Sequence, residues 1–472
     1  MEIVGILVVV YGAREAAMVD AFSRSQNYKV RMYVADKQKN PFNMQKATGY
    51  VVIPDLNVEE IYKFARRHAD NIDFGMVGPE KPIIEGIRDK IEKETNIPII
   101  CPTKKCAIEK SKVTQRHLFQ KVAPEVNPKF KIFKPEKFRN FEEVKKELFS
   151  WLDELDDQAA VKPDTPAAGK GVGVWGDHFS TREELLDHFL ANYKYGAVIV
   201  EEKVEGEESS FQAFCDGKHV VPLPETRDYK RAFDNDKGPN TGGMGSYKNV
   251  GDILPFMKKA DKEKETQVMN KIFQELKGET TRNTSLLGTP FYAAFIHTRN
   301  GLKILENNSR PGDPEIINIL LLLKEDFVDV CFKMIEGNLT RVELDDRASV
   351  VTYKVPPTYG DYSNVFKGKV RQNEIDKPVN LERAYKLHEK YGDDIRVYPA
   401  SMELRNNQIY ALRSRAVCAV GIGSSIETAR EISLEGLNAI KGGGLWNRND
   451  IASKEHINKS ISHMQQLRGN KR

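Results

Sequence analysis

Short apolar runs alternate with segments of helical periodicity through the first hundred residues of the chain. The runs predict buried strands at residues 3–11, 29–34, 73–77 and 97–100, and the helical spacing predicts helices at 14–25 and 82–95. Strands that are apolar on both faces and separated by helices are typical of a parallel sheet covered on both sides. We therefore expect an α/β domain over about residues 1–105.

The middle of the chain has a more mixed pattern. It predicts strands at residues 159–162, 197–202, 210–216, 218–222, 291–298 and 302–306, and helices at 181–192, 258–276 and 314–334. Residues 278–284 are polar and are interpreted as a surface loop. Several of these strands follow one another without an intervening helix, which favours antiparallel hairpins. We expect a second domain over about residues 106–340.

The last part of the chain is rich in predicted strands. They fall at residues 348–354, 367–370, 396–401, 408–411 and 415–422, and a helix follows at 424–440. This pattern indicates a β-rich C-terminal domain at residues 341–452. Residues 453–472 are basic and are interpreted as a tail.

The charge and the cysteine content exclude several functions. The chain of 472 residues has 72 basic and 68 acidic side chains, a net charge of +4, so no basic excess indicates nucleic-acid binding. The apolar run at residues 3–10 is too short to span a bilayer, and Glu2 precedes it where a signal peptide would have basic residues. The five scattered cysteines fit no disulfide or zinc pattern. We expect a cytoplasmic protein with no membrane or nucleic-acid partner.

A glycine-containing loop follows the predicted strand at 159–162. Residues 161–173 include Gly169, Lys170, Gly171 and Gly173, and glycines let backbone N–H groups approach phosphate oxygens. The spacing is not that of a Walker A loop. An ordinary tight turn is the alternative reading.

Two further segments carry candidate chemistry. Residues 237–247 combine glycines, a proline, Asn240 and Thr241, a composition typical of a loop that wraps a ligand or is simply flexible. In residues 304–315, strand alternation places Glu306, Asn308 and Arg310 on one side. Such a set suits a divalent cation that bridges phosphates, with the guanidinium on an anionic oxygen. An exposed polar edge strand is the alternative.

Taken together, these motifs resemble those of the phosphoribosylamine–glycine ligase (glycinamide ribonucleotide synthetase) family of ATP-grasp enzymes. The most specific match is residues 238–245, and further matches occur in the family's order at residues 78–82, 102–104, 111–112, 162–171, 206–211, 230–231, 306–315 and 446–451. The resemblance extends from residue 1 to about 452. It implies an ATP-grasp fold of the α/β and α+β classes, with an N-terminal parallel α/β (pre-ATP-grasp) domain and a mobile lid over about residues 120–205.

The resemblance also implies a reaction. Glycine's carboxylate would attack the γ-phosphate of ATP to form an acyl phosphate, and the amine of 5-phosphoribosylamine would then displace phosphate in purine biosynthesis. Such a transfer depends on positioning and charge neutralisation rather than on a nucleophilic side chain. ATP and Mg²⁺ or Mn²⁺ are the implied cofactors, and we expect a monomer.

The resemblance assigns roles to residues of this sequence. It implies nucleotide contacts for Lys112, Lys162, Gly169, Lys170, Gly171, Glu201, Val204, Glu208 and Lys230, with the backbone at 201–204 against adenine and Glu208 on the ribose. It implies metal ligation by Glu306 and Asn308, and carboxylate binding and charge stabilisation by Arg310, Asn240, Gly242 and Gly243. It implies binding of the phosphoribosyl substrate by Gly12, Arg14, Gly78, Glu80 and Asp313.

The sequence departs from the family pattern mainly at its first loop. Residues 11–16 read Tyr-Gly-Ala-Arg-Glu-Ala, where the family has a loop richer in glycine that ends in histidine. Asp164, Asn307 and Pro311 are further departures. These changes leave two other hypotheses open: a related ATP-dependent carboxylate–amine ligase with a different acid or amine, and a nucleotide-binding regulator without turnover.

Overall fold

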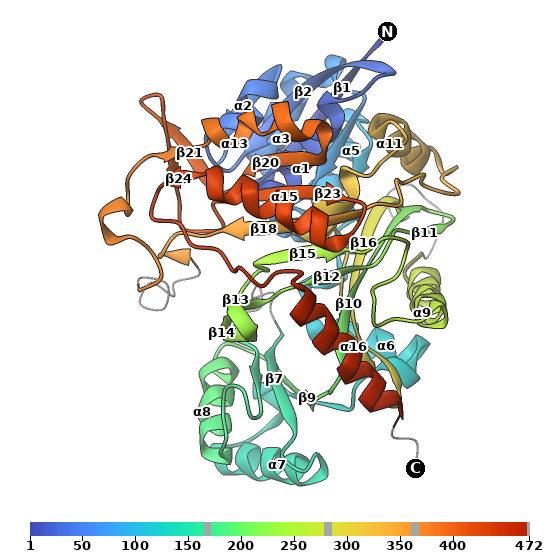
Figure 1. The fold of residues 1–472 in the computed structure, drawn as a ribbon. Coiled ribbons are helices and arrows are strands. Elements are labelled where there is room, and N and C mark those ends of the chain that lie inside the picture. Colours follow the sequence, from blue (N-terminus) through green and yellow to red (C-terminus); the bar gives the residue numbers. More distant parts are fainter. Residues whose placement is uncertain (165–170, 278–285, 360–367, 470–472) are drawn as a thin grey trace.

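The computed structural model describes residues 1–164, 171–277, 286–359 and 368–469 (Figure 1). The predicted surface loop at 278–284 lies outside these residues. The N-terminal part is a five-stranded parallel sheet in the order β3-β2-β1-β4-β5. Its strands are β1 (Glu2–Val10), β2 (Tyr28–Asp36), β3 (Gly49–Val52), β4 (Phe74–Val77) and β5 (Ile99–Ile100), and its helices are α1 (Ala13–Ser23), α2 (Pro41–Lys46), α3 (Val58–Arg67), α4 (Glu80–Glu85) and α5 (Ile87–Thr95).

The helix predicted at residues 82–95 is divided into two. Gly86 has a φ of +93° and lies between α4 and α5. Glycine adopts this left-handed conformation readily and commonly ends a helix there. The direction of the chain therefore changes at Gly86, although the apolar periodicity continues through it.

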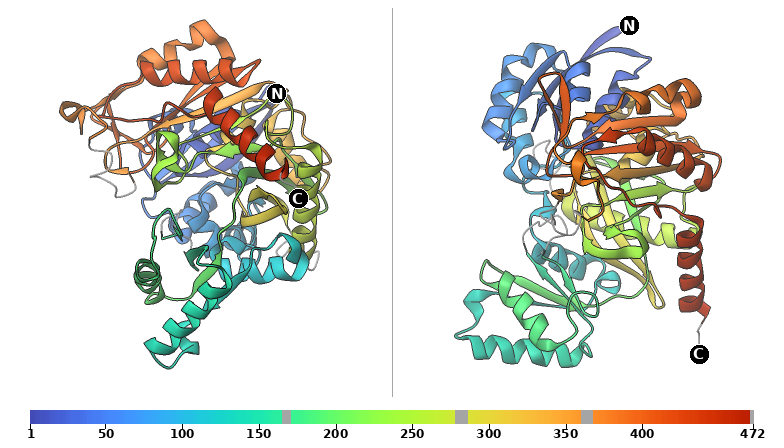
Figure 2. Two further views of the ribbon diagram at one scale, coloured as in Figure 1. Left: turned by 60° about the horizontal axis from the view of Figure 1, so that its bottom comes forward. Right: turned by 60° about the vertical axis from the view of Figure 1, so that its left-hand side comes forward.

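A smaller antiparallel sheet, in the order β6-β9-β7-β8, projects from the rest of the molecule in both views of Figure 2. It is built from β6 (Phe130–Phe133), β7 (Ala159–Pro163), β8 (Gly173–Val174) and β9 (Val198–Glu202), with the helices α7 (Phe141–Glu154) and α8 (Arg182–Tyr193). These elements bury a core of their own, which includes Phe133, Leu148, Trp151 and Phe189. We call residues 130–202 the small lobe.

The largest sheet in the described part of the chain has nine strands, with the path β17-β16-β10-β12-β15-β18-β23-β20 and β11 paired with β10. The strands are β10 (Glu207–Asp216), β11 (Val220–Pro222), β12 (Thr226–Asp228), β15 (Gly245–Lys248), β16 (Leu287–Thr298), β17 (Gly301–Asn308), β18 (Ala348–Lys354), β20 (Ile395–Pro399) and β23 (Val417–Gly423). Residues from the middle and from the last part of the chain thus share one sheet.

The remaining elements surround this sheet. The helices are α6 (Lys112–Val122), α9 (Lys259–Lys277), α10 (Glu315–Leu320), α11 (Phe327–Glu336), α13 (Glu382–Lys386), α14 (His388–Tyr391), α15 (Ile426–Ala439) and α16 (Lys454–Gly469). A two-stranded hairpin joins β13 (Arg231–Phe233) to β14 (Lys237–Asn240), and a further sheet has the order β21-β22-β19-β24. Its strands are β19 (Val379–Asn380), β21 (Met402–Arg405), β22 (Gln408–Ala411) and β24 (Lys441–Gly442).

Two sequence predictions in the C-terminal part are wrong. The described part of the strand predicted at 367–370 is a turn rather than a strand. The basic tail expected after residue 452 is mostly the helix α16, which packs against β10 and β16 and buries His456, Ile457, Ser460 and Met464. Because two of these buried residues are polar, a hydrophobic pattern alone gives a weak signal for the helix.

All five cysteines are buried and free. Among the described helices, none combines the length and the apolar character that crossing a membrane requires.

Candidate active site

A cavity of about 900 Å³ lies where the small lobe, the large sheet and the N-terminal sheet meet. It brings together most of the residues singled out in the sequence, although they are far apart along the chain. These are Gly12, Arg14, Glu80, Lys112, Lys162, Glu201, Val204, Glu208, Lys230, Asn240, Gly242, Glu306, Asn308, Arg310 and Asp313. Gly78, Gly171 and Gly243 are not among its lining residues. Gly169 and Lys170 lie outside the described residues.

On the side of the small lobe, Glu201 joins two cations. The Lys162 Nζ lies 2.6 Å from Glu201 Oε2, and the Arg116 Nη2 donates to the same oxygen at 3.0 Å. Burial alone would raise the pKa of Glu201, but the charges of Arg116 and Lys162 lower it to about 2. Arg116 also donates to the backbone oxygens of Ile304 and Leu305 at 3.0 and 2.7 Å. Arg116 thus connects the small lobe to β17.

Asp164 makes a second connection, between the small lobe and the start of helix α6. Its carboxylate accepts hydrogen bonds from the Val113 amide at 2.8 Å and the Ser111 hydroxyl at 2.9 Å. Ser111 is the N-cap of α6, which begins at Lys112. A carboxylate next to a helix N-terminus is favourable because the first amides of the helix have no partners within it. The departure at Asp164 therefore has a local structural role beside Lys112.

Strand β17 carries the candidate metal ligands. Glu306 pairs in register with Ala294, and Asn308 with Tyr292, and both residues line the cavity. Asn307, between them, is buried on the other side, where its side-chain amide donates to the Met269 sulfur at 3.4 Å. The alternation predicted from the sequence is therefore present.

Several cations surround Glu306. Burial would raise its pKa, but Lys230, Lys112 and Arg310 outweigh this and lower it. Glu306 is thus held as an anion. No cluster of three or more His, Cys, Asp or Glu side chains suited to a metal ion occurs among the described residues.

Arg310 lies just after β17 and pairs with two carboxylates of the N-terminal part. Its Nη2 lies 2.8 Å from Glu109 Oε1, and its Nε lies 3.7 Å from Glu80 Oε2. Burial raises the pKa of Glu109 to about 7, although the Arg310 charge opposes this shift. Glu109 was not predicted from the sequence, because it meets Arg310 only through the tertiary fold.

The segment at residues 240–243 is held by groups from distant parts of the chain. The Gly242 amide donates to the Tyr359 hydroxyl at 2.9 Å, and the Gly243 amide donates to the Thr241 hydroxyl at 3.1 Å. Arg415 donates to the Gly242 oxygen at 2.6 Å. Gly243 has a φ of +103°, and a Cβ there would lie 2.7 Å from Asp228 Oδ1, so that only glycine fits.

Arg415 also fixes Asp313. The two side chains pair at 2.8 Å, and the Tyr353 hydroxyl donates to the other Asp313 oxygen at 2.6 Å. Neither Arg415 nor Tyr359 was predicted from the sequence. Both lie outside the three motifs and reach the cavity from the C-terminal part of the chain.

Lys230 lies among carboxylates that line the cavity. Its Nζ is 2.5 Å from Glu208 Oε2. Burial would lower its pKa, but Glu208, Asp228 and Glu306 raise it. Lys230 therefore remains charged inside the cavity.

The N-terminal loop places Arg14 against Glu15. The Arg14 Nε donates to Glu15 Oε1 at 2.7 Å, and its Nη1 donates to the Pro311 oxygen at 2.9 Å. The Gly12 amide donates to the second Glu15 oxygen at 2.9 Å. A Cβ on Gly78 would lie 2.0 Å from Glu15 Oε1. Gly78 thus makes room for Glu15, and the sequence prediction of a ligand contact there finds no support in the cavity lining.

Comparisons with known proteins agree with this architecture. Residues 4–109 match the family model "Phosphoribosylglycinamide synthetase, N domain", and residues 123–316 match "Phosphoribosylglycinamide synthetase, ATP-grasp (A) domain". The phosphoribosylamine–glycine ligase of Methanocella arvoryzae is 34% identical over 471 residues, which cover 98% of this chain and 100% of that protein. That of Pyrococcus furiosus is 34% identical over 470 residues, or 99% and 98% of the two chains.

Solved structures show the same fold. The crystal structure of phosphoribosylamine–glycine ligase from Thermotoga maritima has a TM-score of 0.72 at 23% identity and covers 95% of this chain and 100% of its own. N5-carboxyaminoimidazole synthetase from Staphylococcus aureus has a TM-score of 0.59 at 10% identity and covers 93% and 98% of the two chains. The fold predicted from the sequence, an ATP-grasp arrangement behind an N-terminal parallel sheet, is confirmed.

Proposed function

The chain belongs to the phosphoribosylamine–glycine ligase family of ATP-grasp enzymes, and from this premise we propose that it joins glycine to 5-phosphoribosylamine in an ATP-dependent step of purine biosynthesis. Glycine would become a glycyl phosphate, and the amine would displace phosphate, so that glycinamide ribonucleotide, ADP and phosphate are the products. The main observation that supports the proposal is that residues from all three motifs of the sequence line the same cavity.

We assign ATP to the side of the cavity next to the small lobe. Lys112 and Lys162 would contact its phosphates. Glu201, which also pairs with Arg116, forms an ion pair with Lys162 and so fixes the position of the Lys162 ammonium group. The backbone at residues 201–204 would hold the adenine. Glu208 would accept hydrogen bonds from the ribose, with Lys230 beside it. Gly171 lies at the end of the loop that would cover the phosphates. The prediction for Gly169 and Lys170 concerns residues outside the described part.

We assign the divalent metal, Mg²⁺ or Mn²⁺, to Glu306 and Asn308. A half-buried carboxylate that stays charged and a neighbouring amide oxygen are ligands that suit a hard cation, and phosphate oxygens would complete its coordination. When bound, such an ion neutralises the charge that develops on the transferred phosphoryl group. The chain's part is to hold these two oxygens on one face of β17.

We predict that Glu306→Gln lowers kcat about 100-fold or more, because it removes a metal ligand from the phosphoryl-transfer site. Folding should change far less, since the amide is similar in size and remains on the same strand. Steady-state kinetics, thermal unfolding and a Mn²⁺ titration followed by electron paramagnetic resonance measure the three effects. Glu382→Gln, on the exposed helix α13, is the control. A loss of melting temperature as complete as the loss of activity would contradict the metal role.

Glycine would bind between Arg310 and Asn240. The Gly242 and Gly243 amides are already occupied by Tyr359 and Thr241, so their part is to shape the wall. Asn240 and Arg310, which both line the cavity, would orient the carboxylate and stabilise charge during transfer. Glu109 and Glu80 reduce the net charge around Arg310, which favours a small zwitterion over a strongly anionic acid.

The phosphoribosyl amine would enter past Gly12, Arg14, Glu80 and Asp313. One observation favours a different amine as a second candidate: the charge of Arg14 is paired with the buried Glu15. This pairing weakens the attraction of the loop for a phosphate. The alternative function is therefore a related ATP-grasp ligase with another amine or acid.

The test is an assay with ATP, Mg²⁺, glycine and 5-phosphoribosylamine that measures ADP and phosphate. Release that requires both glycine and the amine supports the proposal. Release with glycine but no stimulation by phosphoribosylamine would favour the alternative ligase, and nucleotide binding without any release would favour a regulator. We also propose that the enzyme works as a monomer in the cytoplasm, where its free, buried cysteines would stay reduced.

A further inference from the structure

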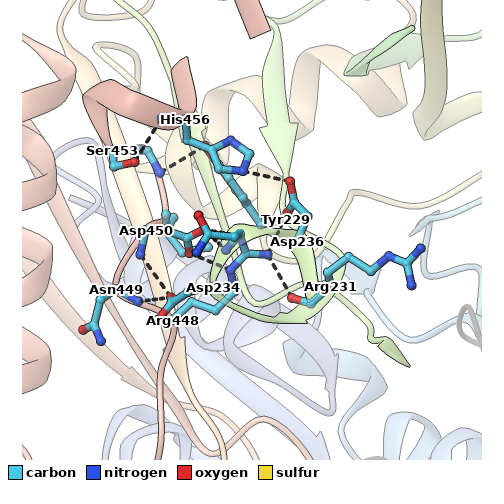
Figure 3. A network of polar contacts seen from close by, with 12 residues as sticks. Tyr229, Arg231, Asp234, Asp236, Arg448, Asn449, Asp450, Ser453 and His456 are labelled. Carbon is cyan, nitrogen blue, oxygen red and sulfur yellow. Dashed lines mark hydrogen bonds and ion pairs between the residues drawn. The ribbon is translucent and has the colours of Figure 1, made fainter. Parts of the chain in front are cut away.

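A dense polar network joins the segment at residues 446–456 to the β13–β14 hairpin (Figure 3). None of the roles assigned above uses this segment, although it resembles a family motif. We propose that Arg448 is a positioning residue, which holds the β13–β14 hairpin so that Lys230 and Asn240 at its base face the reacting groups. The inference rests on the proposed function for the identity of those groups.

Arg448 is completely buried and uses its whole guanidinium. Its Nε and Nη2 donate to the two Asp450 carboxylate oxygens at 2.8 and 2.7 Å. Its Nη1 donates to Asp236 Oδ1 and to the Arg231 backbone oxygen, both at 3.0 Å. The guanidinium also lies over the Tyr229 ring, with its carbon 5.2 Å from the ring centre. Arg448 thus contacts strand β13 and the turn that connects it to β14.

The turn of the hairpin is also fixed by a backbone amide and a carboxylate of residues 446–456. The Asn449 amide donates to Asp234 Oδ1 at 2.8 Å, and the Asn235 amide donates to Asp450 Oδ2 at 2.8 Å. Asn235 and Asp236 have φ values of +62° and +53°. Non-glycine residues adopt this conformation only where surrounding contacts favour it. The network supplies these contacts.

Helix α16 completes the arrangement. The His456 ring Nε2 lies 2.8 Å from Asp236 Oδ2, and the ring packs edge-on against Tyr229. Burial would raise the pKa of Asp236, but His456 and Arg448 lower it strongly. His456 and Asp236 both line the cavity. The C-terminal helix is therefore part of the cavity wall.

The hairpin links these contacts to the reaction site. At its base, the Lys230 backbone oxygen accepts hydrogen bonds from the Thr241 amide and hydroxyl at 2.7 and 2.8 Å. At β13, the Arg231 Nη2 pairs with Asp177 of the small lobe at 2.7 Å. A displaced hairpin would move Lys230, Asn240 and this contact with the small lobe together.

The ionic character of the network supports positioning over simple stabilisation. Buried ion pairs contribute little net stability compared with apolar packing, because desolvation opposes their attraction. What they provide here is one defined geometry for a turn with two left-handed residues. Arginine is suited to this task because its rigid planar fork binds a carboxylate through two parallel hydrogen bonds and further acceptors in one fixed geometry, which the compact ammonium of lysine does not provide.

The experiment compares Arg448→Met, Arg448→Lys and Asp236→Asn with the wild type. Asp236 is 39% exposed, so its variant should fold even if Arg448→Met does not. We expect each variant that folds to show at least a tenfold lower kcat and a KM for ATP raised severalfold. Arg448→Lys should regain melting temperature relative to Arg448→Met without regaining kcat. Arg468→Met is the control: it removes an ion pair between helix α16 and Asp261 on α9, and it should keep wild-type kinetics.

Binding of MgADP by calorimetry separates this inference from the proposed function. If the wild type does not ligate glycine, weaker MgADP binding by Asp236→Asn and Arg448→Lys, with Arg468→Met unchanged, would still support positioning. Wild-type kinetics and MgADP affinity in the folded Arg448 and Asp236 variants would overturn it. So would a kcat that falls only in proportion to the folded fraction.

Discussion

Several charged side chains of the cavity are paired with an opposite charge. Glu201 shows this best, because Arg116 and Lys162 approach its two oxygens and Arg116 also satisfies two backbone oxygens of β17. Such a group links the stability of the fold to the site, since removing one partner leaves another charge buried and unpaired.

This arrangement predicts a pH dependence of stability. The pKa of Glu201 is about 2 in the folded protein, below its ordinary value of 4.5, so its contribution is complete above about pH 4.5 and is lost as the pH falls toward 2. The shift corresponds to roughly 3 kcal/mol. Urea unfolding from pH 7 to the lowest pH at which the protein folds should show Glu201→Gln less stable at pH 7, with a shallower decline below pH 4.5.

Glu435→Gln, at an exposed pair with Lys390, provides the control for this measurement. It should follow the wild-type curve closely, because exposed ion pairs contribute only about 0–1 kcal/mol. Identical slopes for the wild type and Glu201→Gln below pH 4.5 would contradict the role assigned to Glu201.

At the scale of single residues, the sequence predicts well which neighbouring side chains share one face of a strand. It predicts poorly which distant residues meet in the folded protein. Glu306 and Asn308 could be placed together because strand alternation is a local property. Arg116, Glu109 and Arg415 could not be placed in this way. Their partners Glu201, Arg310 and Asp313 lie 85, 201 and 102 residues away, and no local pattern distinguishes the three from solvated charges. These residues organise the cavity without belonging to its motifs.

At the scale of elements, apolar runs are a reliable signal for the buried strands. Those of β1 and β23 fall near their predicted limits because nearly every side chain in them is buried, whereas β16 begins at Leu287, before its predicted start at residue 291. The short strands β12 and β15 contain mostly polar residues or glycine, and β15 pairs with β12 and β18, which are far apart in sequence. Pairing with distant partners, rather than intrinsic preference, makes them strands.

The separate core of the small lobe leads to a prediction about elements. Leu148 on α7 is fully buried in that core, so Leu148→Ala should destabilise the lobe by about 2–5 kcal/mol. Hydrogen exchange measured by mass spectrometry should increase mainly within residues 130–202, and the KM for ATP should rise. Leu437→Ala, in a different core cluster on α15, is the matched control and should increase exchange there instead. A uniform increase over the whole chain would argue against an independent lobe.

At the scale of the whole molecule, the nine-stranded sheet unites the middle and last parts of the chain, and the small lobe stands beside it across the cavity. Few elements connect the two, apart from local links such as Arg116 to β17 and Arg231 to Asp177. Substrates that enter the cavity would touch both sides. This geometry favours closure of the small lobe on the nucleotide, because contacts made in the closed state would stabilise it.

Closure can be measured with pairs of spin labels. All five natural cysteines are buried, so cysteines introduced at Tyr195, which is 81% exposed beside α8, and at Val250, 40% exposed after β15, would be labelled selectively. Double electron–electron resonance should show a shorter distance on addition of a non-hydrolysable ATP analogue with Mg²⁺. A pair at Phe141 and Tyr195, both on the small lobe, should not change, because the lobe moves as a unit. An unchanged Tyr195–Val250 distance with nucleotide bound would mean that the cavity works without closure, and a change in the Phe141–Tyr195 pair would mean that the lobe itself rearranges.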